Sequence, residues 1–205
     1  MSKDYQRLWK DVTSATDEAK AVRTLAEILV DKEGRAFASR LERKEAELCI
    51  EILDRVSRDF HLPSFRRLRC FRQGIAEHNL DRNQKHVFFV TLRRLAGTHG
   101  RLPDSMTITE KIEVSDKILA SGGFADVRCG TYMGRLVAVK TTRVQEQDDL
   151  FKIRKVSIDD GFSDTWNVVS TVLLQQFCKE VILWKMLSHP NVLKLAGAQG
   201  DMEKG

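Results

Sequence analysis

Two neighbouring stretches decide the fold: Leu119-Ala120-Ser121-Gly122-Gly123-Phe124-Ala125-Asp126-Val127 and Leu136-Val137-Ala138-Val139-Lys140. Three short β-prone segments follow one another here, namely Ile118-Leu119, Val127 to Tyr132, and Leu136 to Thr142. The pairs Gly122-Gly123 and Met133-Gly134 separate them, and glycine between β-prone segments is typical of tight hairpin connections. The pattern predicts a three-stranded antiparallel meander.

The first connection is built from small residues. Gly122 and Gly123 have no Cβ, and Ala120, Ser121 and Ala125 are small. Such a turn lets backbone N–H groups approach phosphate oxygens closely. An ordinary hairpin turn has a similar composition, so the turn alone leaves both interpretations open.

Two charged residues stand out against apolar surroundings. Lys140 ends an apolar strand, where its ammonium group needs a counter-charge or reaches water at the strand edge. Further on, helical spacing predicts a buried stripe with Glu180 inside it, formed by Phe177, Val181, Trp184 and Leu187. A carboxylate on an apolar face is costly unless it is paired. We expect Glu180 to pair with Lys140.

In this order the features resemble the eukaryotic protein kinase family, and in particular tyrosine-kinase-like Ser/Thr kinases of the fungal type. The family has a glycine-rich loop, a Val-Ala-Ile-Lys strand, and a helix glutamate that pairs with the lysine. The matching residues are Gly122, Val127, Val137-Ala138-Val139-Lys140 and Glu180. Residues 188–193, Ser-His-Pro-Asn-Val-Leu, are similar to the turn that leads from the family's regulatory helix into the next strand.

The resemblance implies an incomplete kinase upper lobe (N-lobe) over residues 105–205. Helical periodicity predicts a helical bundle over residues 1–104, so the expected fold class is α+β. It implies an ATP site in which Leu119, Val127 and Ala138 line the adenine pocket. Ser121, Gly122 and Gly123 would cover the phosphates, Ala120 would belong to the same nucleotide site, and Lys140, held by Glu180, would bind the phosphates. The parent enzyme would transfer the γ-phosphoryl group of ATP to Ser or Thr of protein substrates.

The sequence departs from the family pattern in three respects. Ala120 and Ala125 replace the first and third loop glycines, which weakens nucleotide binding without excluding it. No His-Arg-Asp or Asp-Phe-Gly motif occurs, so we expect this chain to be inactive alone and Mg²⁺ to bind only in a complete kinase. The interval from Lys140 to Glu180 is long, and its segment 156–175 contains no Lys or Arg. A translated retained intron and a genuine flexible insertion both fit that segment.

The first hundred residues carry helical periodicity and no recognisable chemistry. Four helices are expected. The first begins near Asp17 with Thr16 as its cap and ends at Gly34, and the second runs from about Arg35 to Arg58. A short third helix begins at Pro63-Ser64, and a fourth is capped by Asp81 and ends at Gly97 and Gly100. An interaction or positioning role, with a protein as partner, fits this region.

Charge and composition narrow the other possibilities. The chain of 205 residues has a formal net charge of +5. The segment from His61 to Arg101 is strongly basic, with nine Lys and Arg residues and two Asp and Glu residues. Nucleic-acid binding through Arg66, Arg67 and Arg69 is disfavoured relative to a solvated helix face. Dispersed cysteines and histidines predict no metal site, and the absence of a long apolar run predicts no membrane span and a cytoplasmic location. The main alternative to a kinase is a non-catalytic, pseudokinase-like scaffold.

Overall fold

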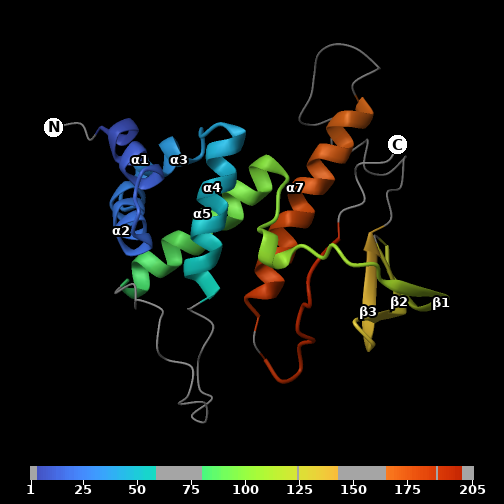
Figure 1. Ribbon diagram of the computed structural model, residues 1–205. Coiled ribbons are helices and arrows are strands. Elements are labelled where there is room, and N and C mark those ends of the chain that lie inside the picture. The colour runs from blue at the N-terminus through green and yellow to red at the C-terminus, as the bar shows by residue number, and fades with distance from the viewer. Residues whose placement is uncertain (1–3, 59–79, 124, 143–164, 188, 200–205) are drawn as a thin grey trace, which may run out of the picture. The chain divides into compact units, whose positions relative to one another are not determined.

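The protein is described here by a computed structural model that covers residues 4–58, 80–123, 125–142, 165–187 and 189–199 (Figure 1). The fold is α+β, with six α-helices and one three-stranded antiparallel sheet in the described residues. Contacts group the chain into two units. The helical unit comprises Met1–Thr107 and Leu174–Ala198, and the sheet unit comprises Ile108–Leu173 and Gln199–Gly205.

The helical unit is assembled from helices that share one apolar core. Its elements are α1 (Tyr5–Thr13), α2 (Glu18–Leu29), α3 (Lys32–Ala38), α4 (Arg43–Arg58), α5 (Arg82–His99), the 3₁₀ turn η2 (Asp104–Met106), and the part of α7 (Thr165–Lys185) that starts at Leu174. Apolar residues at helical spacing form one core, in which Leu25, Leu53, Phe88 and Leu92 are fully buried.

Polar caps fix the ends of these helices. Asp81 and Gln84 form a reciprocal capping box at the start of α5, which confirms the predicted cap. Gly100 ends α5 in the left-handed conformation at φ 59°, as expected. The cap of α2 was assigned wrongly to Thr16, because it is the Asp17 carboxylate that accepts a hydrogen bond from the backbone N–H of Ala19.

Gly34 does not end the first long helix, contrary to expectation. The helix α2 ends at Leu29, and Gly34 lies buried inside α3, whose cap Asp31 accepts a hydrogen bond from the Gly34 N–H at 2.8 Å. A Cβ at Gly34 would collide with the Ile28 carbonyl, so the glycine permits a close approach between α3 and the end of α2. Glycine therefore serves packing here, and its interpretation as a stop signal was wrong.

Three other helix predictions have different outcomes. The single helix expected over residues 35–58 is two helices, α3 and α4, with a break between Ala38 and Arg43. Gly97 lies within α5, so only Gly100 stops that helix. The short helix expected from Pro63-Ser64 lies outside the described residues. Among the described helices, none is long and apolar enough to cross a bilayer.

The predicted meander is present in the sheet unit. Its strands β1 (Glu113–Ser121), β2 (Ala125–Tyr132) and β3 (Arg135–Thr142) pair antiparallel in sequence order (Figure 1). Met133 at φ 49° and Gly134 at φ 72° form the tight turn between β2 and β3. The strand β1 begins earlier than the expected Ile118-Leu119, and its pairing with β2 is irregular on both sides of Ile118.

The segment after α7 forms the expected turn but does not continue as a strand within the described residues up to residue 199. The backbone N–H of Val192 donates to the carbonyl of His189 at 3.0 Å, which closes the turn. The indole N–H of Trp184 then donates to the Leu193 carbonyl at 2.9 Å. Further along, Ala198 forms only an isolated bridge, with Thr107. A side chain of α7 thus takes a backbone acceptor that a strand partner would need.

Candidate functional site

The sheet brings four of the predicted site residues to one face. Lys140 lies directly opposite Val127, which in turn lies opposite Ala120, so these residues form a row across all three strands. Ala138 lies opposite Cys129. Paired and alternate residues of a strand share a face, so Ala120, Val127, Ala138 and Lys140 lie on the same side of the sheet.

Cys129 belongs to this face as well and was missed by the sequence argument. The available signal was strand alternation, because Cys129 lies two residues after Val127 on β2. A shallow hollow of about 320 Å³ lies farther along the strands, lined by Glu113, Val114, Ser115, Cys129, Gly130, Thr131 and Leu136. Its size is at the lower end of small-molecule sites.

The turn between β1 and β2 leaves space above its glycines. A Cβ at Gly123 would meet no described atom within 4 Å, and one at Gly122 would lie 3.6 Å from the Ala125 carbonyl oxygen. Among the described residues, positive φ angles occur at Met133, Gly100 and Gly134 only. Neither backbone conformation nor crowding by the described atoms requires glycine at positions 122 and 123.

The backbone of Gly122 is already used by the hairpin. Its N–H donates to the Ala125 carbonyl at 2.9 Å, so Gly123 and Phe124 alone separate the closing pair. Phe124 lies outside the described residues. A phosphate that took this N–H group would have to replace the hydrogen bond to Ala125.

Ser121 fastens the base of the same turn. Its hydroxyl donates to an Asp126 carboxylate oxygen at 2.8 Å, and Asp126 is buried at 8% exposure. The two residues pair directly across β1 and β2, one position from the row of Val127, and therefore lie on the opposite face from Lys140. Sequence reasoning missed Asp126, although a polar residue beside a turn of small residues was an available signal.

Leu119 does not join the common face through regular pairing. It lies between Ile118 and Ala120, where the register of β1 against β2 shifts, and its side chain is 53% exposed. A bulge changes which side of the sheet a residue points to, so alternation does not assign Leu119 to the face of Val127.

The predicted buried stripe of α7 is wrong in part. Val181 is buried, together with Cys178 and Ile182, whereas Leu187 is 49% exposed. Glu180 is exposed and does not lie in the buried stripe. The physical reason is that the helical unit covers the face of Cys178, Val181 and Ile182, and Glu180, two positions from Cys178 and from Ile182, projects from another side of the helix.

The opposite side of α7 is of mixed character. Leu183 is 42% exposed, and helical spacing places it on the same side as the exposed Gln176 and Glu180, while the 49% exposed Leu187 follows the end of the helix at Lys185. Helices with apolar residues on several sides are generally covered on more than one side. Glu180 belongs to the helical unit and Lys140 to the sheet unit, so the expected pairing of these residues stays a prediction.

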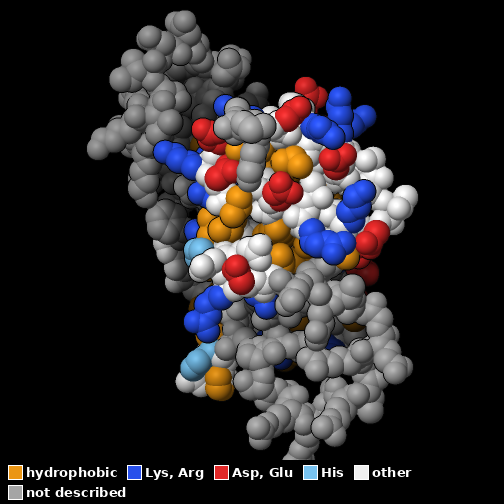
Figure 2. All heavy atoms as spheres, turned by 90° about the vertical axis from the view of Figure 1, so that its left-hand side faces the viewer, with side chains coloured by type: hydrophobic (Ala, Val, Ile, Leu, Met, Phe, Trp, Pro, Cys, Tyr) orange, Lys and Arg blue, Asp and Glu red, His pale blue; other side chains and the backbone are white. Residues whose placement is uncertain are grey.

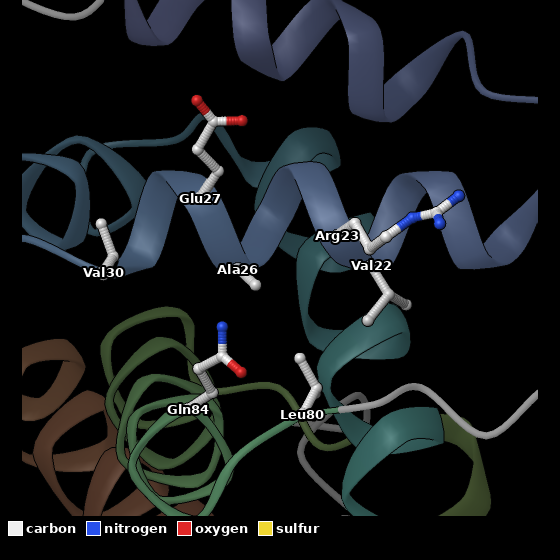
Figure 3. Close-up of a pocket in the computed structure, with 7 residues that line it drawn as sticks. All are labelled: Val22, Arg23, Ala26, Glu27, Val30, Leu80 and Gln84. Carbon is white, nitrogen blue, oxygen red and sulfur yellow. The ribbon is translucent and has the colours of Figure 1, made fainter.

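A second hollow lies in the helical unit between α2 and the start of α5, and it carries no catalytic constellation. Its volume is about 310 Å³, and it is lined by Val22, Arg23, Ala26, Glu27, Val30, Leu80 and Gln84. In Figure 3 the Gln84 amide points towards α2, whereas the Glu27 carboxylate points away from the hollow. The described residues also contain no group of three His, Cys, Asp or Glu side chains that could hold a metal ion.

Comparisons with known proteins add no family to these observations. A scan against models of protein families, a search of curated proteins and a search of solved structures each found no match. The resemblance to protein kinases therefore depends on the motif residues and on how the sheet arranges them.

Proposed function

We propose that this chain contains the ATP-binding upper lobe of a protein kinase, whose parent enzyme phosphorylates Ser or Thr of protein substrates. The observation that carries the proposal is the row Ala120–Val127–Lys140 beside a glycine turn in which no described atom lies within 4 Å of a Cβ at Gly123. Small and apolar residues on one face suit a nucleobase, and a lysine on the same face suits its phosphates.

Different residues of this face would contact different parts of the ATP molecule. Val127 and Ala138 would contact the adenine, while the ammonium group of Lys140 would bind the phosphate oxygens. The phosphates could approach the backbone of Gly123 closely, because no described atom lies within 4 Å of the position that a Cβ would take there. Bound Mg²⁺ supplies charge neutralisation to the phosphates in a complete kinase.

Glu180 is proposed to hold Lys140 in place. Glu180 lies on an exposed side of α7, which it shares with the 42% exposed Leu183. A carboxylate that becomes covered on such a surface requires a cation. Lys140 supplies that cation in this proposal.

Mg-ATP titration of matched lysine variants tests the site. Lys140→Met should weaken Mg-ATP binding about 10- to 100-fold, because a hydrogen bond to a charged group contributes about 1.5–3 kcal/mol. The control is Lys117→Met, which removes an equally exposed lysine from β1. Calorimetry should give wild-type affinity for the control. Equal losses in both variants, or no binding by the folded wild type at millimolar Mg-ATP, would reject the proposal.

A non-catalytic scaffold is the second candidate, and one observation favours it. The Gly122 N–H and the Ser121 hydroxyl are both engaged within the hairpin, which leaves fewer donors for phosphate. A scaffold of this kind predicts that millimolar Mg-ATP leaves the melting temperature unchanged, whereas a nucleotide site predicts an increase.

Nucleic-acid binding gains no such support. Figure 2 shows acidic and basic side chains interspersed over one face of the helical unit, rather than a basic patch there. The cluster of Arg66, Arg67 and Arg69 lies outside the described residues.

A further inference from the structure

The helix that carries Glu180 is part of the core of the N-terminal helices. Cys178, Val181 and Ile182 of α7 are 1%, 4% and 0% exposed, and they belong to the same buried cluster as Leu53 of α4 and Leu92 of α5. Residues separated by about eighty or more positions along the chain therefore share one core. The N-terminal helices and α7 therefore form one core, although the three strands lie between them in the sequence.

Close packing against the end of α5 reinforces this attachment. A Cβ at Gly97 would overlap the Lys179 side chain, and one at Gly100 would lie 2.8 Å from a methyl carbon of Leu174. The Gln175 amide also donates to the carbonyl of Thr98 at 3.4 Å. The two glycines of α5 thus allow α7 to approach closely.

The far end of α7 is tied as well. The ammonium group of Lys185 donates to the carbonyls of Leu195 and Ala196 at 3.4 Å each. The next residues return to the end of the N-terminal region, where the Ala198 N–H donates to the Met106 carbonyl at 2.8 Å. Both ends of this part of α7 are therefore held within the helical unit.

We propose that the N-terminal helices of the helical unit hold α7 and thereby position Glu180. The buried packing of Cys178, Val181 and Ile182 in the core of these helices is called the seat of α7. Cys178, Val181 and Ile182 fix the rotation of the helix, and this rotation sets the direction in which Glu180 projects. The role of Glu180 at Lys140 rests on the proposed function above. Because coupling between two sites is reciprocal, loosening the seat weakens Mg-ATP binding, and Mg-ATP in turn tightens the seat.

Two buried thiols provide a direct readout of the seat. Cys178 lies on the seated face of α7, and Cys49 lies in α4 within the same core. Burial raises the pKa of Cys178 to about 11 and that of Cys49 to about 12, so N-ethylmaleimide should modify both slowly in the folded chain. Release of α7 alone exposes Cys178 and leaves Cys49 protected, whereas unfolding of the whole unit exposes both.

A matched pair of substitutions loosens either the seat or another part of the core. Ile182→Val removes one methylene from α7, and Ile28→Val removes one from α2; both isoleucines are fully buried. Each should lower the melting temperature of the helical unit by about 5 °C. Only Ile182→Val should raise the ratio of Cys178 labelling to Cys49 labelling, by at least about threefold. It should also weaken Mg-ATP binding more than Ile28→Val does.

Three results would overturn the proposal. The first is rapid labelling of wild-type Cys178 while Cys49 stays protected. The second is an equal labelling ratio in the two valine variants. The third is tight Mg-ATP binding that is unaffected by Ile182→Val and does not slow Cys178 labelling. If neither the wild type nor the variants bind Mg-ATP, the proposed nucleotide site is rejected. The labelling ratios alone then decide whether the N-terminal helices hold α7.

Discussion

At the scale of single residues, Glu51 gives the helical unit a pH dependence. Its carboxylate lies half-buried on α4 and accepts a hydrogen bond from the Asp104 N–H at 2.9 Å. Burial raises the pKa of Glu51 above its ordinary value, and the Asp104 N–H and the Arg101 charge oppose this rise only in part. The carboxylates of Asp104 and Asp54 raise the pKa further.

Glu51→Gln should therefore stabilise the helical unit more at neutral pH than in acid. The folded chain binds this proton more tightly than the unfolded chain, so the free energy of unfolding falls as pH rises through the folded-state pKa of Glu51. Glutamine keeps an oxygen acceptor for Asp104 and removes the titration. Urea unfolding at about pH 4 and about pH 7 checks the difference, with exposed Glu42→Gln as the control. A gain that is no larger at about pH 7 than at about pH 4 would contradict the prediction.

The individual site residues were predictable from sequence to different degrees. Strand alternation relates Ala138 to Lys140 within β3, whereas their common face with Val127 depends on the register of β2 with β3. The exposure of Glu180 was not predictable, because α7 has apolar residues on more than one side and the sequence does not say which side the helical unit covers. Asp126 escaped notice because its burial depends on the pairing of β1 with β2.

At the scale of secondary structure, the connections of the sheet were more predictable than the breaks between helices. Glycine beside β-prone segments located both hairpins, and a local capping box located the start of α5. The break between α3 and α4 contains no Gly or Pro, and Gly34 lies inside a helix because of a contact with Ile28. These features are set by packing, which periodicity does not capture.

The turn between β2 and β3 carries a correctable strain. Met133 has φ 49° and is 74% exposed, so it adopts a left-handed conformation without a compensating burial. Met133→Asn should stabilise the hairpin by about 0.5–1 kcal/mol, because Asn tolerates this conformation and Asn-Gly favours this class of turn. Slower hydrogen exchange of the β2 and β3 amides would record the gain. Met133→Val, with a β-branched side chain, should accelerate exchange; the reverse order of the two variants would contradict this account.

At the scale of the whole molecule, the two units are interleaved along the chain. The helical unit takes its helices from both sides of the sheet in sequence, since α7 follows β3 and yet joins the core of α4 and α5. Formation of the helical core therefore requires a long-range contact, which sequence periodicity cannot reveal. The position of α7 therefore depends on the N-terminal helices, a region for which the sequence predicts an interaction or positioning role.

The two units also differ in how much apolar surface they bury, and this difference predicts their order of unfolding. In the described part of the sheet unit, Ile108 alone among apolar residues is buried, whereas the helical unit buries a cluster that includes Trp9 of α1. Burial of apolar surface is the main source of stability, and a small sheet that buries few apolar residues is marginal. We expect the amides of β1, β2 and β3 to open at a free energy lower by about 2 kcal/mol or more than those of α4 and α5.

Hydrogen exchange followed by mass spectrometry over a urea series measures this difference for each element. Fluorescence provides an independent marker of the helical core, because Trp9 is 2% exposed and its indole N–H donates to Glu45 at 2.9 Å. Replacing the other two tryptophans, Trp166 and Trp184, with Phe would assign that signal to Trp9. The sheet amides should lose protection at urea concentrations where Trp9 stays buried. A single shared midpoint for all elements would mean that the sheet is stabilised by the helical unit and that the two units unfold as one cooperative body.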